Sequence, residues 1–170
     1  MITVPELLAN LPPEPDEEAL FRHIRQAVAD SGRKLVVIDD DPTGTQTVHD
    51  VELLTTWNTD VLAQALRENQ VFYVLTNSRS MPEGEAVQLN RELAQQLVAA
   101  GQKTKVDFVV ASRSDSTLRG HYPAEVFALA RGLTRAGDHE GRPYGMRAGT
   151  GRRGDGEEEF DGHLVVPAFF

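Results

Sequence analysis

Short apolar runs alternate with longer amphipathic stretches from Lys34 onward, and this alternation limits the fold more than any other feature of the chain. The runs are rich in Val, Leu, Ile and Phe, and polar or glycine-rich residues end each of them. Buried strands of a parallel sheet have this pattern, because helices connect the strands and cover the sheet. The sequence predicts strands at 34–38, 51–55, 71–75, 107–111 and 163–167.

The stretches between these runs have the spacing of amphipathic helices. In 83–101, for example, Leu89, Leu93 and Leu97 recur on one face, and Gly101 is the predicted stop. Alternating strands and helices predict a Rossmann-like, three-layer α/β sandwich with a mainly parallel sheet. Helices are predicted at 16–31, 59–69, 83–101 and 122–135.

The length of 170 residues fits one ordinary domain. Prolines cluster before residue 16, so we assign 1–33 to an N-terminal arm and a helix, and 34–170 to the domain itself. Residues 136–162 are rich in glycine and charge, which predicts a flexible insertion. The last predicted strand is followed directly by Phe169 and Phe170, so we expect a domain that is incomplete at its C-terminus, within a longer protein.

Charge and composition narrow the class of partner. The formal net charge is −9, the wrong sign for a protein that binds a phosphate backbone, so nucleic acid is not expected. The chain has no cysteine, which excludes a disulfide framework, a thiolate zinc site and a cysteine nucleophile. No apolar run has the roughly 18 residues that span a bilayer, and the acidic first residues differ from a secretory signal. We expect a cytoplasmic protein with a small-molecule ligand.

Polar residues gather directly after three of the predicted strands. Residues 39–45 (DDDPTGT) follow the first strand, 76–80 (TNSRS) follow the third, and 112–121 (SRSDSTLRGH) follow the fourth. The carboxyl ends of parallel strands meet at one edge of a sheet, where such folds bind ligands. The sequence therefore predicts that these three clusters form one cleft.

The residue types in this predicted cleft suit a small anionic ligand that carries hydroxyl groups. Arginine binds a carboxylate or phosphate with two parallel hydrogen bonds, and aspartate accepts hydrogen bonds from hydroxyls. Clustered carboxylates can also act as a base or hold Mg²⁺, and single aspartates of this kind often cap turns and helices. We assign no metal ligand. The candidate ligand-binding residues are Asp40, Asp41, Arg79, Arg113, Asp115, Ser116 and Arg119.

Neither of the two common phosphate-binding loops for nucleotides is present. Thr43-Gly44-Thr45 lacks the Gly-Lys-Ser/Thr of a Walker loop, and the chain contains no GxGxxG. No residue is therefore assigned to a nucleotide.

Four motifs, in order over about 34–170, resemble the N-terminal domain of the four-carbon acid sugar kinase family. They are Asp40-Asp41-Pro42-Thr43-Gly44, Ser78-Arg79-Ser80, Arg113-Ser114-Asp115-Ser116-Thr117-Leu118-Arg119-Gly120 and Val166-Pro167-Ala168-Phe169. The resemblance implies an ATP-dependent kinase that phosphorylates sugar acids such as threonate or erythronate. In that family the N-terminal domain binds the sugar acid, and a C-terminal domain binds the nucleotide.

The resemblance also implies roles for individual residues. Asp40, Asp41, Arg79, Asp115, Ser116 and Arg119 would hold the sugar acid, with Asp41 as the catalytic base. ATP and Mg²⁺ are expected for the full-length enzyme, and no site for them is identifiable in this chain. Because the C-terminal nucleotide-binding domain would be missing, we expect the chain to be inactive alone.

Two other interpretations stay open. Asp39-x-Asp41-x-Thr43 after a strand, with Thr76-Asn77 after a later one, resembles the haloacid dehalogenase-type phosphatases. In such an enzyme Asp39 is the nucleophile, Asp41 the acid and base, and Mg²⁺ the cofactor. That interpretation leaves the 112–121 cluster unexplained. The second alternative is a sugar-acid-binding module without catalytic activity.

Overall fold

The computed structural model describes residues 3–4, 15–46, 48–114 and 119–134. The chain divides into two compact units, residues 1–32 and 33–170. The first unit contains helix α2 (Glu17–Ser31), close to the predicted 16–31. Asp16 caps its first turn by accepting a hydrogen bond from the Ala19 N–H at 3.0 Å, and Gly32 ends it in the left-handed conformation with φ 62°.

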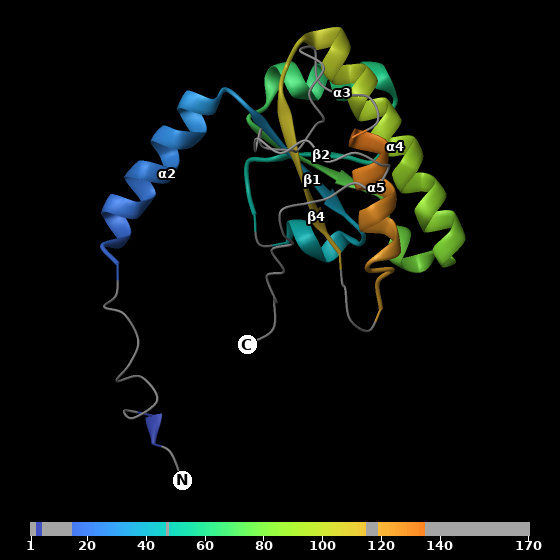
Figure 1. The fold of residues 1–170 in the computed structure, drawn as a ribbon, viewed down its shortest axis with the longest axis horizontal. Helices are drawn as coiled ribbons and strands as arrows, with labels where there is room; N and C mark the ends of the chain where they lie inside the picture. Colours follow the sequence, from blue (N-terminus) through green and yellow to red (C-terminus); the bar gives the residue numbers. More distant parts are fainter. Residues whose placement is uncertain (1–2, 5–14, 47, 115–118, 135–170) are drawn as a thin grey trace, which may run out of the picture. The chain divides into compact units, whose positions relative to one another are not determined.

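The second unit contains a parallel four-stranded sheet with the order β2-β3-β1-β4 (Figure 1). The strands are β1 (Lys34–Asp39), β2 (Glu52–Leu54), β3 (Val71–Leu75) and β4 (Phe108–Arg113). Four predicted strands are confirmed within two residues of their bounds. The predicted strand at 163–167 and the predicted insertion at 136–162 lie outside the described residues.

Within the described part of this unit, three α-helices connect and cover the strands. They are α3 (Thr59–Glu68), α4 (Glu83–Thr104) and α5 (Ala124–Thr134), and α4 packs against both of the others. The predicted stop at Gly101 is wrong. Gly101 is buried inside α4, and the helix ends where Lys105 takes the left-handed conformation (φ 58°) and donates its N–H to the Gly101 carbonyl at 2.8 Å. Continued packing of the last turn outweighs the tendency of glycine to end a helix.

The hydrophobic core lies between these helices and one face of the sheet. Alternate residues of the central strands, such as Val36 and Ile38 in β1 or Phe72 and Val74 in β3, pack into it, as period-two alternation requires. Trp57, which follows β2, is half-buried against this core. The parallel sheet and its helices confirm the predicted Rossmann-like α/β sandwich.

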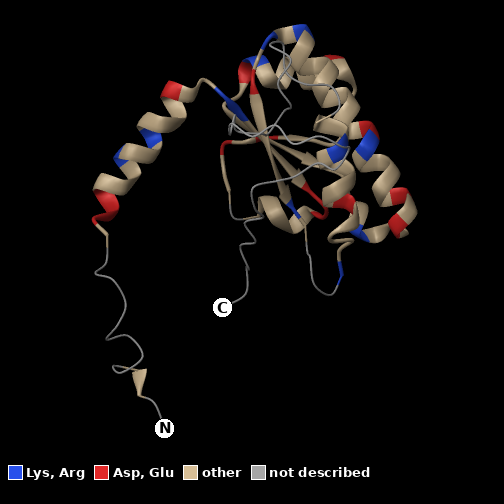
Figure 2. Ribbon diagram, in the orientation of Figure 1, with Lys and Arg blue, Asp and Glu red and all other residues tan. Residues whose placement is uncertain are grey.

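Charged residues lie at the ends of the strands rather than within them (Figure 2). β1 begins with Lys34 and ends with Asp39, and β4 ends with Arg113. A charge within these strands would be buried without water, so the strand ends are where charged groups can stay solvated or paired. Among the described residues, no helix is both long and apolar enough to cross a membrane.

Gly132 generates a prediction about the contact between α4 and α5. A Cβ at this position would lie 2.4 Å from the Ala94 Cβ, so the two helices approach closely here. Gly84, in the first turn of α4, has no atom within 4 Å of such a Cβ. Alanine favours a helix over glycine by up to about 1 kcal/mol, whereas overpacking costs about 1–3 kcal/mol.

We therefore expect Gly132→Ala to lower the free energy of unfolding and its matched control Gly84→Ala to leave it unchanged or raise it. Urea denaturation of both variants beside the wild type measures these differences. Equal effects of the two substitutions would contradict the close contact of the helices.

Candidate functional site

The three polar clusters come together at the end of the central strand β1. The cluster 39–45 begins at the end of β1 itself, and the clusters 76–80 and 112–121 follow its two neighbours, β3 and β4. β1 lies between β3 and β4, and Asp39 is in register with Leu75 on one side and with Arg113 on the other. β3 and β4 lie on opposite sides of β1 and run parallel to it, so the loops that follow all three strands leave at the same edge of the sheet. The predicted convergence is confirmed for 39–45, 76–80 and the start of 112–121.

Arg79 holds two of the aspartates together. Its guanidinium donates to both carboxylate oxygens of Asp40, from Nε at 3.0 Å and from Nη2 at 2.8 Å, and its Nη1 donates to Asp41 Oδ2. The side chain of Arg79 is 13% exposed and that of Asp40 is 3% exposed. A bidentate pair of this kind has fixed geometry and is shielded from salt. Arg79 therefore acts first as a clamp on the loop after β1.

Arg113 is the more open of the two arginines. Its Nη1 lies 3.5 Å from Asp39 Oδ1, 3.4 Å from Asp41 Oδ1 and 3.4 Å from Thr43 Oγ1. These contacts are long, and the side chain is 40% exposed. An arginine held loosely by one nitrogen keeps donors for a ligand carboxylate or phosphate. Arg113 is therefore the guanidinium best placed to bind an anion.

Asp39 is completely buried beneath the short helix η1 (Pro42–Thr45). A Cβ on Gly44 would lie 2.0 Å from Asp39 Oδ2, so only glycine lets the loop pass over this carboxyl group. Within the part of the chain that the structure describes, Oδ2 has no hydrogen-bond partner. Burial raises the pKa of Asp39 to about 6. The positive charge of Arg113 acts to lower this pKa, whereas the negative charges of Asp40 and Asp41 act to raise it.

Asp41 differs from Asp39 in both exposure and pKa. Burial acts to raise its pKa, but the hydroxyl and N–H of Thr43, together with Arg79 and Arg113, outweigh burial and hold the pKa below its usual value. The Thr43 N–H donates to Asp41 Oδ1 at 2.9 Å, so Asp41 also caps η1. Its side chain is 15% exposed. Asp41 therefore stays ionised and within reach of a ligand.

A buried hydrogen-bonded chain fixes the loop that carries Arg79. Thr76 Oγ1 lies 3.0 Å from the Asp39 carbonyl oxygen and 3.1 Å from Ser78 Oγ, and Ser78 Oγ donates to Glu125 Oε2 at 2.9 Å. Glu125 is 3% exposed and lies in the first turn of α5. Sequence reasoning missed Glu125, because an acidic residue in the first turn of a helix is common and its partner is 47 positions away.

The structure brings together four of the predicted ligand-binding residues, namely Asp40, Asp41, Arg79 and Arg113. Arg119 lies in the turn before α5 and is exposed. The predictions for Asp115 and Ser116 fall outside the described residues.

The aspartate triad is crowded enough to suggest a cation site. One oxygen from each of Asp39, Asp40 and Asp41 lies within 4.8 Å of the others. Oxygens of these carboxylates already accept hydrogen bonds from Arg79 and Arg113, so a divalent cation would have to displace a guanidinium. Mg²⁺ also requires nearly ideal octahedral geometry and keeps several waters. The triad therefore does not fit an Mg²⁺ site.

The phosphatase interpretation gains no support from this geometry. Its nucleophile would be Asp39, which is 0% exposed and covered by Gly44. A nucleophile has to reach the reacting atom to within about 3–3.5 Å. Asp39 could do so only if η1 moved away.

Comparison with known proteins identifies one family. The model of the family described as "Sugar-binding N-terminal domain" matches residues 35–170, well over half of the chain. No curated protein and no solved structure matches the chain.

The pKa of Asp39 generates a prediction about stability and pH. The folded state holds the Asp39 proton more tightly than the unfolded state, so stability is lost as pH rises from about 4 to about 6. A shift from 3.8 to about 6 corresponds to about 3 kcal/mol. We expect the stability of Asp39→Asn, relative to the wild type, to rise by about this amount between pH 4 and pH 7, measured by urea denaturation.

Asp41→Asn is the matched control with the opposite sign. The lowered pKa of Asp41 stabilises the fold above the ordinary pKa of 3.8, and this contribution is lost as pH falls. Asp41→Asn should therefore lose stability relative to the wild type as pH rises through that range. A parallel pH dependence of the two variants would contradict the difference in burial between the two carboxyl groups.

Arg79→Ala should destabilise the protein far more than removal of a surface arginine. It leaves Asp40 buried without the guanidinium, and breaking a buried pair in this way costs about 3–5 kcal/mol. Arg67→Ala on the exposed side of α3 is the control, with an expected effect within about 0.5 kcal/mol. Urea denaturation measures both, and equal effects would show that Arg79 is no clamp.

Proposed function

Because the chain belongs to the sugar-binding N-terminal domain family, the N-terminal domain of the four-carbon acid sugar kinases, we propose that it binds a four-carbon sugar acid of the threonate or erythronate type. In this proposal the chain is the substrate-binding part of an ATP-dependent kinase. The family assignment supports a sugar ligand, and the charges at the end of β1 support one that is both anionic and hydroxylated.

The position of Arg113 is the observation that carries the proposal. Its guanidinium is partly exposed and lies beside the carboxylates of Asp39 and Asp41, at the carboxyl ends of the parallel strands β1 and β4. A ligand carboxylate can bind the open side of this guanidinium, while the ligand hydroxyls donate to aspartate oxygens. The main role of Arg79 and Asp40 is then to hold the loop after β1 in place, and they do not bind the ligand by themselves. Asp115, Ser116 and Arg119 remain proposed contacts from the third cluster.

We assign Asp41 as the acceptor of the proton from the substrate hydroxyl. Its side chain is 15% exposed, whereas Asp39 is fully buried, so Asp41 is the carboxylate that a hydroxyl can reach. Its lowered pKa makes it a weak base. A weak base suffices for phosphoryl transfer, because its loose transition state depends mainly on positioning and on charge stabilisation.

ATP with Mg²⁺ would supply the phosphoryl group, and we propose that the C-terminal domain of the family binds them. The chain has no Walker loop, and the aspartate triad does not fit Mg²⁺. The residues of this chain then bind and orient the sugar acid, and the chain alone binds it without phosphorylating it. A sugar-acid-binding module with no catalytic role predicts the same binding and differs only when the nucleotide domain is added.

Calorimetric titration of the 170-residue chain with threonate and with erythronate tests the proposal. We expect the wild type to bind at least one of them without ATP and to give no heat with Mg-ATP. Arg113→Ala should weaken binding about 10- to 100-fold, since hydrogen bonds between charged groups contribute about 1.5–3 kcal/mol. Its stability should change by less than about 1 kcal/mol, because the side chain is 40% exposed.

Arg131→Ala, on the exposed side of α5, is the control and should bind like the wild type. Binding that is unchanged in Arg113→Ala would refute the cleft as the sugar-acid site. Binding of neither sugar acid by the folded wild type would refute the proposed ligand class for this chain.

A further inference from the structure

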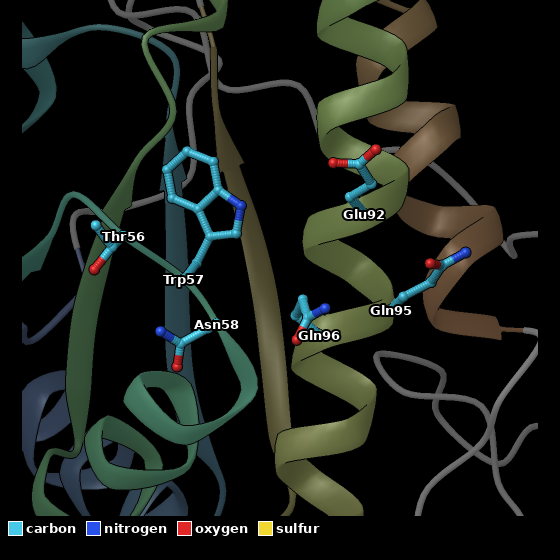
Figure 3. A pocket seen from close by; sticks show the side chains of 6 residues that line it. All are labelled: Thr56, Trp57, Asn58, Glu92, Gln95 and Gln96. Atoms are coloured by element: carbon cyan, nitrogen blue, oxygen red, sulfur yellow. The ribbon is translucent and has the colours of Figure 1, made fainter.

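A groove lies between the loop after β2 and helix α4 (Figure 3), and its lining shares no residue with the aspartate and arginine cluster. Its volume is about 380 Å³, within the range of roughly 300–1,000 Å³ that is typical of small-molecule sites. The loop contributes one aromatic ring, a hydroxyl and an amide, and α4 contributes a carboxylate and two amides. The lining residues are Thr56, Trp57, Asn58, Glu92, Gln95 and Gln96.

Trp57 supplies the one aromatic surface of this groove. The side chain is half-buried, because it packs against the hydrophobic core while it also lines the groove. In Figure 3, Glu92 and Gln96 project from the side of α4 that faces Trp57. A tryptophan held by the core on one side offers a rigid apolar surface on the other, which costs little entropy on binding.

The polar groups around Trp57 are partly engaged with their neighbours. Asn58 Oδ1 accepts from the N–H groups of Asp60 and Val61 at 3.1 and 3.0 Å, which caps α3. Gln96 Oε1 accepts from the Thr59 hydroxyl at 2.5 Å. These bonds fix the orientation of the two amides, so that their oxygens are used and their NH₂ groups remain as donors.

Glu92 is held in a similar way and provides the complementary acceptor. Gln88 Nε2 donates to Glu92 Oε1 at 2.8 Å, which leaves Oε2 to accept a hydrogen bond from a ligand. The groove therefore presents a donor on Gln96 and an acceptor on Glu92, next to an aromatic ring. Each hydroxyl of a sugar or polyol both donates and accepts, and matches such a mixed set.

The charge of the groove indicates that its ligand differs from the ligand of the cleft. None of the described residues that line it is a lysine or an arginine, and Glu92 carries a negative charge. An anion such as a sugar acid would therefore be repelled. An ammonium ion could lie on the tryptophan ring near the carboxylate, but it would leave the NH₂ donor of Gln96 unused.

We propose that the groove between Trp57 and α4 is a second binding site, for a neutral hydroxyl-rich molecule of monosaccharide size. The ring of Trp57 covers an apolar C–H face of the ligand, and the amides and carboxylate bind its hydroxyls. This site does not depend on Arg113 or on the aspartates of the cleft.

Trp57 makes the experiment specific, because it is the only tryptophan in the chain. The full chain is titrated with erythritol, xylose and glucose while its tryptophan emission is recorded. We expect a saturable change with at least one of these neutral ligands. Gln96→Ala and Glu92→Ala should each raise the apparent Kd about tenfold, the effect of losing one hydrogen bond of about 1.4 kcal/mol. Gln102→Ala, on an exposed position of α4 outside the groove, should leave the Kd unchanged.

Two further titrations distinguish binding at this groove from binding at the sugar-acid cleft. Arg113→Ala should leave the response to the neutral ligand unchanged, and any response to threonate should be insensitive to Gln96→Ala. Failure of threonate to bind would refute the proposed function and not the groove. Tetramethylammonium is titrated in the same way, as the probe for a cationic ligand. The second site is refuted if no neutral ligand changes the emission, or if only tetramethylammonium gives the saturable change. It is also refuted if the Kd in Gln96→Ala and Glu92→Ala is the same as in the wild type.

Discussion

The candidate site depends on the burial of adjacent carboxyl groups at the end of the central strand. Asp39 and Asp40 are almost fully removed from water, and ionised carboxylates in such a place need a partner. Arg79 is the partner of Asp40, with two hydrogen bonds, and it also donates to Asp41, whereas Arg113 lies 3.5 Å from Asp39. This pairing joins the loops after β1 and β3, and Ser78 with Glu125 extends the connection to α5. This charge compensation therefore joins the loops that carry the candidate site.

The two arginines have different roles in this arrangement. Arg79 is enclosed and paired twice, so its charge is largely used within the protein. Arg113 is held by long contacts at one nitrogen and is far more exposed, so it can exchange an internal contact for a ligand. A sugar acid needs both kinds of group. A fixed set of acceptors orients its hydroxyls, and an accessible guanidinium binds its carboxylate.

The cleft and the groove at Trp57 differ in charge in a way that suits different ligands. The cleft offers a guanidinium and suits an anion, whereas the groove offers amides, a carboxylate and an aromatic ring and suits a neutral polyol. The two sites are built on different loops, the first after β1, β3 and β4 and the second after β2. One parallel sheet thus provides binding positions on more than one of its loops, as is common in α/β folds.

The sequence by itself determined the parallel α/β architecture and the meeting of the polar clusters, because periodicity is local and parallel strands bring their carboxyl ends to one edge. It could not determine the pairing of Arg79 with Asp40, the covering of Asp39 by Gly44 or the burial of Glu125. Those contacts join residues that lie up to 47 positions apart, except for the Gly44 contact, which depends on the path of η1. Only the tertiary structure decided which arginine became a clamp and which stayed accessible, because burial and charge compensation are set by all the neighbouring elements together.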